Sequence, residues 1–146
     1  MSTDALPKSE GCHCLAVRQA GRRVSRFYDQ FMAPVGLRTT QFSILAKLQR
    51  LGPLSINALA AAMVMDRTTL GRTIQPLKRQ GLVAVVSGRI DRRRKELRLT
   101  DAGAERLCCA VRQWIRAQDR FEEIFGAERA AALRALLQIV SASEQL

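Results

Sequence analysis

MDRTTLGRTIQPLKRQGLV, residues 65–83, is the stretch of sequence that decides the fold. Its apolar residues Leu70, Ile74 and Leu77 recur at helical spacing, so one face of a helix is predicted to pack on a core. Asp66 stands where a helix N-cap is expected, and Gly81 where a helix is expected to end. The opposite face is polar and basic, and it carries Arg67, Thr68, Thr69, Arg72 and Gln75. The stretch therefore predicts an amphipathic helix with a cationic N-terminal half exposed to solvent.

The segments on either side of this helix complete a known type of unit. Upstream, Ser55 can cap a short helix that carries Ile56 and Leu59. Downstream, residues 82–86 and 96–99 have the patterns of short strands, and SGRIDRRRKE, residues 87–96, joins them. Two short helices followed directly by a basic hairpin are typical of a winged helix-turn-helix. The predicted fold is therefore mainly α with a small β-hairpin.

Long helices are predicted at both ends of the chain. Between residues 10 and 32 apolar residues step by three and four positions, and the pattern returns in helices predicted from residue 101 and from about residue 128. A chain of 146 residues has little core of its own in which to bury these stripes. We therefore expect them to pair with a second copy. This makes residues 1–36 and 101–146 dimerisation regions around a winged helix-turn-helix at residues 37–100.

The net charge indicates a polyanionic partner. The chain has 24 Lys and Arg against 13 Asp and Glu, which gives a net charge of +11, and residues 67–98 alone carry +8 of it. Nucleic acid is the first candidate partner and an anionic membrane surface the second. Because the charge concentrates on a helix and a hairpin rather than on one amphipathic helix, we expect double-stranded DNA and no membrane. The residues expected to contact DNA are Ser55, Arg67, Thr68, Thr69, Arg72, Gln75, Arg89, Arg92, Arg93 and Arg94.

DRRRKELRLTDAG, residues 91–103, resembles the D-x-R…L-T-x-x-G wing signature of the MarR family, with matches at Asp91, Arg93, Leu99, Thr100 and Gly103. GPLSINALAAAM (residues 52–63), residues 67–83 and the order of the helices extend the resemblance over essentially the whole chain. The resemblance implies a triangular homodimer with intertwined terminal helices, each winged lobe binding half of a pseudo-palindromic operator. It also implies that Asp91 and Arg93 shape the wing, and that Arg92 or Arg93 enters the minor groove. The expected function is sequence-specific transcription regulation by a repressor that a signal releases from DNA.

Oxidation of a first-helix cysteine is the first candidate signal. CHCLAVRQAGRRVSRFYDQF, residues 12–31, resembles the organic-hydroperoxide-sensing branch of that family. In that branch a cysteine at the position of Cys14 is oxidised and tyrosines hydrogen-bond to it; Tyr28 has the spacing of one of them, and Arg18 replaces the other. Cys12, Cys108 or Cys109 could resolve the oxidised thiol as a disulfide. Cys14, Cys12 and Tyr28 are therefore the candidate redox residues, although cysteine is also a common small core residue.

Two other signals stay open. Members of the resembled family bind small aromatic or lipophilic ligands between the dimerisation helices and the winged lobe, where Arg18, Arg22 and Tyr28 could line a pocket. Metal is the weakest alternative, because Cys12 and Cys14 would point to nearly opposite faces of a helix and their spacing is unlike a structural zinc motif. We expect no metal site and no cofactor.

An enzyme is not expected from this sequence. It contains no phosphate-cradling glycine loop, no Gly-x-Ser-x-Gly elbow and no His-Glu-x-x-His. A His-dependent triad would have to use His13, the single histidine, and thiol catalysis through Cys14 has nothing else in its favour. The polar residues 1–11 lack the apolar segment of a signal peptide, and no apolar run approaches the length of a spanning helix. We therefore expect a cytoplasmic protein.

Overall fold

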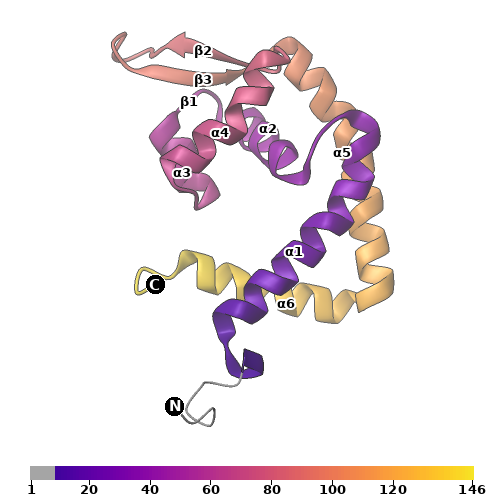
Figure 1. The fold of residues 1–146 in the computed structure, drawn as a ribbon. Helices are drawn as coiled ribbons and strands as arrows, with labels where there is room; N and C mark the ends of the chain where they lie inside the picture. Colours follow the sequence, from indigo (N-terminus) through magenta and orange to yellow (C-terminus); the bar gives the residue numbers. More distant parts are fainter. Residues whose placement is uncertain (1–8) are drawn as a thin grey trace, which may run out of the picture.

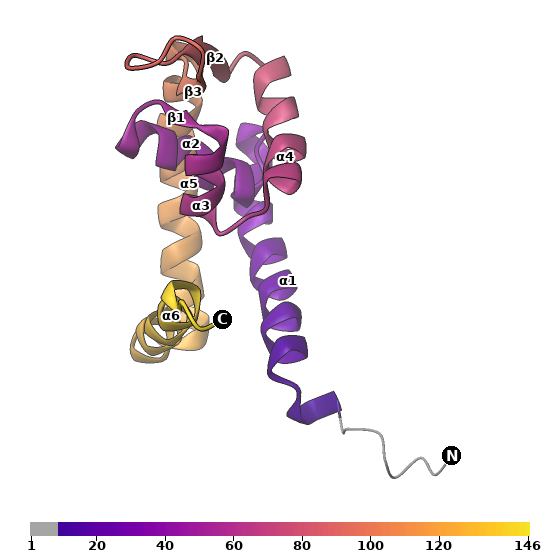
Figure 2. The ribbon, with the colours of Figure 1, turned by 90° about the vertical axis from the view of Figure 1, so that its left-hand side faces the viewer.

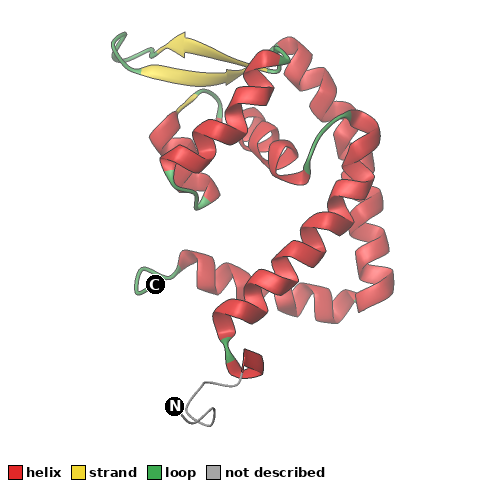
Figure 3. Cartoon of the chain, in the orientation of Figure 1, coloured by secondary structure: helices red, strands yellow, loops and turns green. Residues whose placement is uncertain are grey.

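The computed structural model describes residues 9–146, in which helices dominate and three short strands form a single sheet (Figure 3). Residues 1–8, part of the expected N-terminal dimerisation region, lie outside the described residues. None of the helices in residues 9–146 is long and apolar enough to cross a membrane. The elements are α1 (His13–Met32), α2 (Thr39–Leu51), β1 (Leu54–Ser55), α3 (Ile56–Met63), α4 (Arg67–Arg79), β2 (Val83–Ser87), β3 (Lys95–Leu99), α5 (Asp101–Phe125) and α6 (Ala127–Ala142), with 3-10 turns at Ser9–Gly11 and Ala33–Val35.

Three helix starts follow directly from the local sequence. The side chain of Ser55 accepts the N–H of Ala58 at 3.1 Å and begins α3. The carboxylate of Asp66 accepts the N–H of Thr69 at 2.7 Å and begins α4. Thr100 caps α5 in the same way. Each cap satisfies backbone N–H groups that have no partner inside the helix, and the predicted caps Ser55 and Asp66 are confirmed.

The start of α2 differs from the expectation. Threonine is a common capping residue, and Thr39 and Thr40 both stand at the start of this helix, but the N-cap is Arg38. The side chain of Gln41 accepts the N–H of Arg38 at 2.9 Å, and the carboxylate of Asp29 accepts the N–H of Thr39 at 2.7 Å. Asp29 belongs to α1, so the negative charge at this helix N-terminus comes from a different helix. That contact ties the long N-terminal helix to the winged lobe.

The sheet has three strands, where the sequence predicts a two-stranded hairpin. β2 and β3 pair antiparallel as expected, and β1 pairs with the other edge of β3, giving the order β1-β3-β2. Leu54 lies opposite Leu97 and Ser55 opposite Glu96. A segment of two residues is too short to show the alternation of apolar and polar residues from which a strand is predicted. The sequence alone therefore does not predict β1. Its pairing places the start of α3 beside the wing.

The core of the winged lobe is formed where α2, α3 and α4 meet the sheet and the N-terminal part of α5. Leu70, Ile74 and Leu77 are buried, which confirms the predicted apolar face of α4. Among the described residues no polar or charged side chain is buried. The remaining large members of this core are Met32, Leu37, Phe42, Ile44, Leu45, Leu48, Leu59, Leu82, Val83, Leu97 and Leu107.

The terminal helices extend away from this lobe. The indigo α1 and the long α5 leave the lobe on one side; α6 passes behind the lower part of α1 in Figure 1, and Figure 2 shows the two helices apart. Val17 on α1, Ile115 and Ile124 on α5, and several large apolar side chains of α6 are exposed in the single chain. The helices therefore form an extended arm, whose apolar side chains the chain itself does not cover.

Val64 in the turn between α3 and α4 carries backbone strain. It is the only described non-glycine residue with a positive φ (52°, ψ 47°), and its side chain is 73% exposed. The left-handed conformation costs an L-residue roughly 1–2 kcal/mol, and a β-branched side chain fits it poorly. We expect Val64→Gly to stabilise the protein by about 1 kcal/mol, since little packing is lost. Urea unfolding should show a higher midpoint for this variant than for Val64→Ala, and equal midpoints would contradict the strain.

Candidate nucleic-acid interface

α4 presents its N-terminal half to solvent. The side chains predicted to contact DNA from this helix, namely Arg67, Thr68, Thr69, Arg72 and Gln75, are all exposed. The helix continues through Pro76, whose ring provides no N–H for a helical bond to the carbonyl of Arg72. The Thr69 hydroxyl donates to Asp66 at 2.6 Å, so this side chain already serves the cap. The side chain of Ser55 is likewise engaged in capping α3.

Asp66 anchors this helix start through its charge. Hydrogen bonds from the side chain and the backbone N–H of Thr69 hold the pKa of the Asp66 carboxyl below its ordinary value. A carboxyl whose pKa is lower in the folded state stabilises the protein above the unfolded-state pKa, near 3.9. That stabilisation is lost as the pH falls through the lower folded-state value.

The stability of Asp66→Asn should therefore depend less on pH than that of the wild type. Asparagine keeps a capping oxygen but cannot titrate. The expected result is a smaller loss of urea midpoint between pH 6 and pH 3 in the variant. Parallel curves for the two proteins would show that the ionised Asp66 adds nothing to the cap.

The wing loop has a defined shape. The N–H of Gly88 donates to the carbonyl of Arg94 at 2.7 Å, and that of Arg94 donates to the carbonyl of Asp91 at 3.1 Å. The carboxylate of Asp91 accepts the N–H of Arg93 at 2.9 Å. A Cβ on residue 88 would lie 2.6 Å from the Asp91 carbonyl oxygen, so only glycine fits there. Asp91 thus contacts the backbone of Arg93, the other residue expected to shape the wing.

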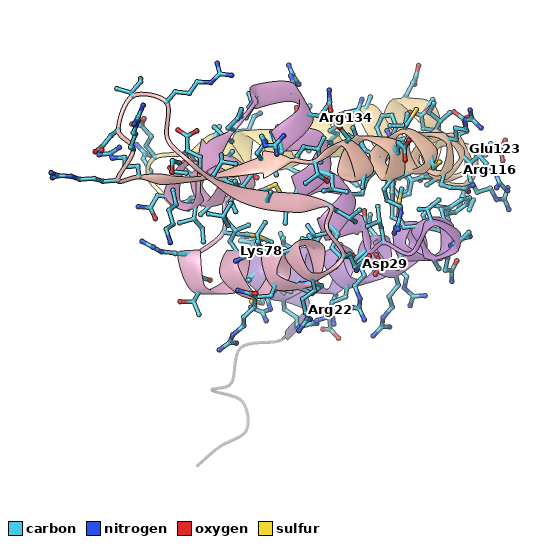
Figure 4. The ribbon with its side chains drawn as sticks, turned by 90° about the horizontal axis from the view of Figure 1, so that it is seen from above. Arg22, Asp29, Lys78, Arg116, Glu123 and Arg134 are labelled. Atoms are coloured by element: carbon cyan, nitrogen blue, oxygen red, sulfur yellow. The ribbon has the colours of Figure 1, made fainter. Side chains whose placement is uncertain are left out.

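The arginines of the wing are exposed and unpaired with carboxylates. Across residues 9–146 the one salt bridge joins Arg120 to Glu123, both on α5. Nitrogen-tipped side chains point outward around the loop between β2 and β3 (Figure 4). The wing residues concerned are Arg89, Arg92, Arg93 and Arg94. Such a loop is free to bind a polyanion.

A hollow of about 580 Å³ lies between α3, α4 and the base of the wing. It brings together four of the predicted residues, Ser55, Arg67, Gln75 and Arg94. The hollow is not lined by the other predicted residues, which are Thr68, Thr69, Arg72, Arg89, Arg92 and Arg93. The hollow also includes Asn57, Lys78, Lys95 and Glu96, which are not among the residues predicted to contact DNA.

Of these, Asn57 could not have been found from the sequence. Its side-chain oxygen accepts from the Arg67 guanidinium at 3.5 Å, a contact between α3 and α4 that only the tertiary structure shows. Lys78 and Lys95 belong to the strongly basic residues 67–98, so the charge pattern could have indicated both as DNA contacts. The hollow therefore joins the two predicted elements, helix and wing, into one cationic surface.

The candidate redox cysteines lie together at the start of α1. Cys12 is the N-cap, with extended backbone, and its sulfur accepts the N–H of Leu15 at 3.4 Å. Cys14 follows in the first turn, and both side chains are exposed, as are those of Cys108 and Cys109 on α5. No group of three His, Cys, Asp or Glu residues within 9–146 is arranged to hold a metal ion.

Tyr28 lies far along α1 from Cys14. Fourteen residues of α-helix span about 21 Å, so the two side chains of one chain cannot meet. The Tyr28 hydroxyl instead donates to Gln118 on α5, and burial, followed by the nearby charge of Glu122, raises its pKa. Any contact between this tyrosine and Cys14 would need Tyr28 from a second copy.

Two hollows adjoin Tyr28. The larger, about 670 Å³, is an apolar groove between α1, α5 and α6, and the smaller, about 310 Å³, lies between α1, α2 and α5. Arg18 and Arg22 line neither of them. In Figure 4 Arg22 lies at the outer edge of the molecule, opposite the side of Arg134, which lines the larger groove. Of the three predicted pocket residues, only Tyr28 lines these hollows.

Known structures share this architecture. The transcriptional regulator MosR of M. tuberculosis, in a complex with DNA, is 34% identical and has a TM-score of 0.75, over 90% of this chain and 97% of that one. The transcriptional repressor CouR bound to a 23-mer DNA duplex is 27% identical with a TM-score of 0.80, over 93% and 98% of the two chains.

A third structure, BpsR of Bordetella bronchiseptica, whose DNA binding is regulated by 6-hydroxynicotinic acid, is 24% identical with a TM-score of 0.78, over 95% and 100% of the chains. No curated protein sequence matches this chain. Residues 37–95, which contain α2, α3, α4 and β2 of the winged lobe, match the MarR family. With the helix order, the wing and the identity to MosR in agreement, the chain belongs to the MarR family of winged helix-turn-helix, DNA-binding transcription regulators.

Proposed function

We propose that this chain acts as a homodimeric repressor that binds an operator in duplex DNA through α4 and the wing, and that it catalyses no reaction. The observation that carries the proposal is the cationic hollow in which α3, α4 and β3 meet beside the unpaired wing arginines. Arg67, Arg72 and Gln75 are the candidates for base contacts, because Arg and Gln can form paired hydrogen bonds to guanine and adenine. The wing arginines are the candidates for phosphates and the minor groove.

In the proposed homodimer, dimerisation is the role of residues 1–36 and 101–146, and DNA binding is the role of residues 37–100. Its support is the groove of about 670 Å³ between α1, α5 and α6, together with the exposed apolar side chains of these helices. A second copy offers the same helices, so both chains would bury apolar surface in a self-complementary interface. Two winged lobes would then meet two half-sites of one operator.

The dependence of DNA affinity on salt tests the wing. The probe is a duplex carrying the promoter region of the protein's own gene, and fluorescence anisotropy gives the affinity at several salt concentrations. Arg92→Ala or Arg93→Ala should weaken binding to many sequences and lower the salt slope by roughly one unit per lost phosphate contact. Arg120→Ala, which removes the paired arginine of α5, is the control. An unchanged slope and affinity in both wing variants would show that the wing does not contact DNA.

Sequence preference tests α4 separately. Arg72→Ala or Gln75→Ala should reduce the preference for the promoter duplex over a scrambled duplex, by about 1–3 kcal/mol for each lost paired contact. Binding to the scrambled duplex should change much less. Full specificity in both variants would mean that α4 is not the recognition helix.

For the signal, we favour oxidation at Cys14. The Cys14 thiolate would attack an organic hydroperoxide, break its O–O bond, and leave a sulfenic acid and an alcohol. The Cys12 thiol would then displace water from the sulfenic sulfur and form a disulfide. Both thiols are exposed, and Cys12 is the extended N-cap rather than a residue of the helix, so the two side chains are not held on opposite faces of α1. This end of α1 adjoins the apolar groove. A disulfide there would alter the start of a dimerisation helix.

A small ligand is the second candidate signal. The hollow of about 310 Å³ lies at the junction of α1 with α2, where the arm meets the winged lobe. Tyr28, Phe42 and Trp114 give it aromatic walls, and Gln118 and Ser43 supply polar atoms. An aromatic acid or phenol bound there could change the angle between the arm and the lobe.

One comparison separates the two signals. DNA affinity is measured with and without cumene hydroperoxide for the wild type, Cys14→Ser and the control Cys109→Ser. Release of the wild type and of Cys109→Ser, with Cys14→Ser still bound, supports the thiol mechanism. If all three proteins remain bound, the thiol mechanism fails, and aromatic carboxylates and phenols are tested next, with Trp114→Ala as the variant expected to lose the response.

A further inference from the structure

Ile90 at the tip of the wing is the most exposed large apolar side chain of residues 9–146. Its exposed fraction is 103%, compared with 90% for Leu146 at the chain end. A single exposed apolar residue is common on protein surfaces. Its position here is unusual, because it projects from the outermost loop of a cationic surface.

Backbone hydrogen bonds close the loop that carries this side chain. The bond from Gly88 to Arg94 joins the two ends of the loop, and the bonds from Arg93 and Arg94 to Asp91 close a turn directly after Ile90. A Cβ on residue 88 would lie 2.6 Å from the Asp91 carbonyl oxygen, so the two sides of the loop approach closely at this point. Ile90 lies between these hydrogen-bonded residues, and its full exposure shows that it packs against nothing on its own chain.

The surroundings of Ile90 define the chemistry of a partner. Its neighbours in the sequence carry four positive charges, on Arg89, Arg92, Arg93 and Arg94, and a single negative charge, on Asp91. A partner must offer anionic groups on either side of a less polar strip. The minor groove of DNA does so, since phosphates border deoxyribose walls and base edges across a width of about 6 Å. Several minor-groove proteins insert isoleucine or leucine at such places.

We propose that Ile90 is an apolar DNA contact that enters the minor groove while the neighbouring wing arginines bind the phosphates. This inference rests on the proposed function, because it places the wing on duplex DNA. DNA is favoured over an anionic membrane because the same cationic surface continues into the hollow beside α4, whereas one isoleucine offers little apolar area to a bilayer.

Salt dependence distinguishes this contact from a charged one. For the promoter duplex, Ile90→Ala should weaken binding about five- to tenfold at every salt concentration and leave the slope unchanged, because no phosphate contact is lost. Ile90→Met, which keeps an apolar side chain, should bind within about twofold of the wild type. Arg89→Ala should lower the slope, and Leu146→Ala, which changes an exposed apolar residue away from the wing, should bind as the wild type. All four variants should unfold at the wild-type temperature.

A modified duplex tests the groove itself. Replacing adenine with 2,6-diaminopurine adds an amino group to the minor groove of A·T pairs and leaves the major-groove donors and acceptors in place. On that duplex, wild type and Ile90→Ala should differ by less than on the unmodified one.

Three results would overturn the inference alone. Equal binding of Ile90→Ala and wild type would remove the contact while leaving the proposed function intact. A changed salt slope in Ile90→Ala would show that the substitution acts through the arginines. If Ile90→Ala lost binding to phosphatidylserine vesicles and kept its DNA binding unchanged, Ile90 would be a membrane contact instead. A wild type that binds no duplex DNA would instead refute the proposed function and this inference together.

Discussion

Gly103→Ala should destabilise the protein by about 3 kcal/mol or more. A Cβ built on Gly103 would lie 2.1 Å from the carbonyl oxygen of Leu82 and 2.7 Å from Cδ1 of Leu99. The Leu82 carbonyl accepts the N–H of Thr100 at 3.1 Å, so moving it would also break the contact that joins the N-cap of α5 to the residue before β2. Overpacking normally costs 1–3 kcal/mol, and a backbone group has less freedom to move than a side chain. Urea unfolding followed by circular dichroism gives the change in free energy at a fixed protein concentration.

Gly71→Ala is the matched control for this prediction. Gly71 also lies inside a helix, α4, but a Cβ there would have no atom within 4 Å. Alanine is the better helix former by roughly 0.5–1 kcal/mol, so this variant should be slightly more stable than the wild type. If both glycine variants lost similar stability, the close approach of α5 to Leu82 would not explain the result for Gly103.

Leu137→Glu should convert the dimer to monomers and reduce DNA affinity by a factor of about one hundred or more. Leu137 is 41% exposed in the single chain and lines the groove between α1, α5 and α6. A carboxylate costs little there in the isolated chain, because water reaches it. In the dimer the same charge would be buried without a partner. Loss of the second winged lobe removes the gain in affinity from binding two linked half-sites.

Sedimentation and anisotropy measure the two effects of Leu137→Glu. Leu146→Glu is the control, since it adds the same charge at a residue that is 90% exposed and outside the groove. A folded Leu137→Glu protein that remains dimeric would place the dimer interface elsewhere. A folded monomer with wild-type DNA affinity would show that one winged lobe is sufficient.

The site could be predicted from the sequence only in part. The charge pattern and the helical period predicted exposed residues on α4 and in the wing, because both depend on residues close together in the chain. They could not show that Ser55, Arg67, Gln75 and Arg94 share a hollow with Asn57. Nor could they show that the hydroxyl of Thr69 is engaged by Asp66, or that Tyr28 donates to Gln118. Such contacts depend on how the helices pack.

The sequence by itself determined the order of the helices and the starts of α3, α4 and α5. The caps at Ser55, Asp66 and Thr100 are hydrogen bonds between residues three positions apart, so local composition is sufficient to specify them. The tertiary structure alone decided that β1 joins the sheet and that Asp29 supports α2. In each case the hydrogen-bond partner of a short or polar segment lies in a distant part of the chain. The two segments meet only when the core forms, so the local sequence pattern does not predict the contact.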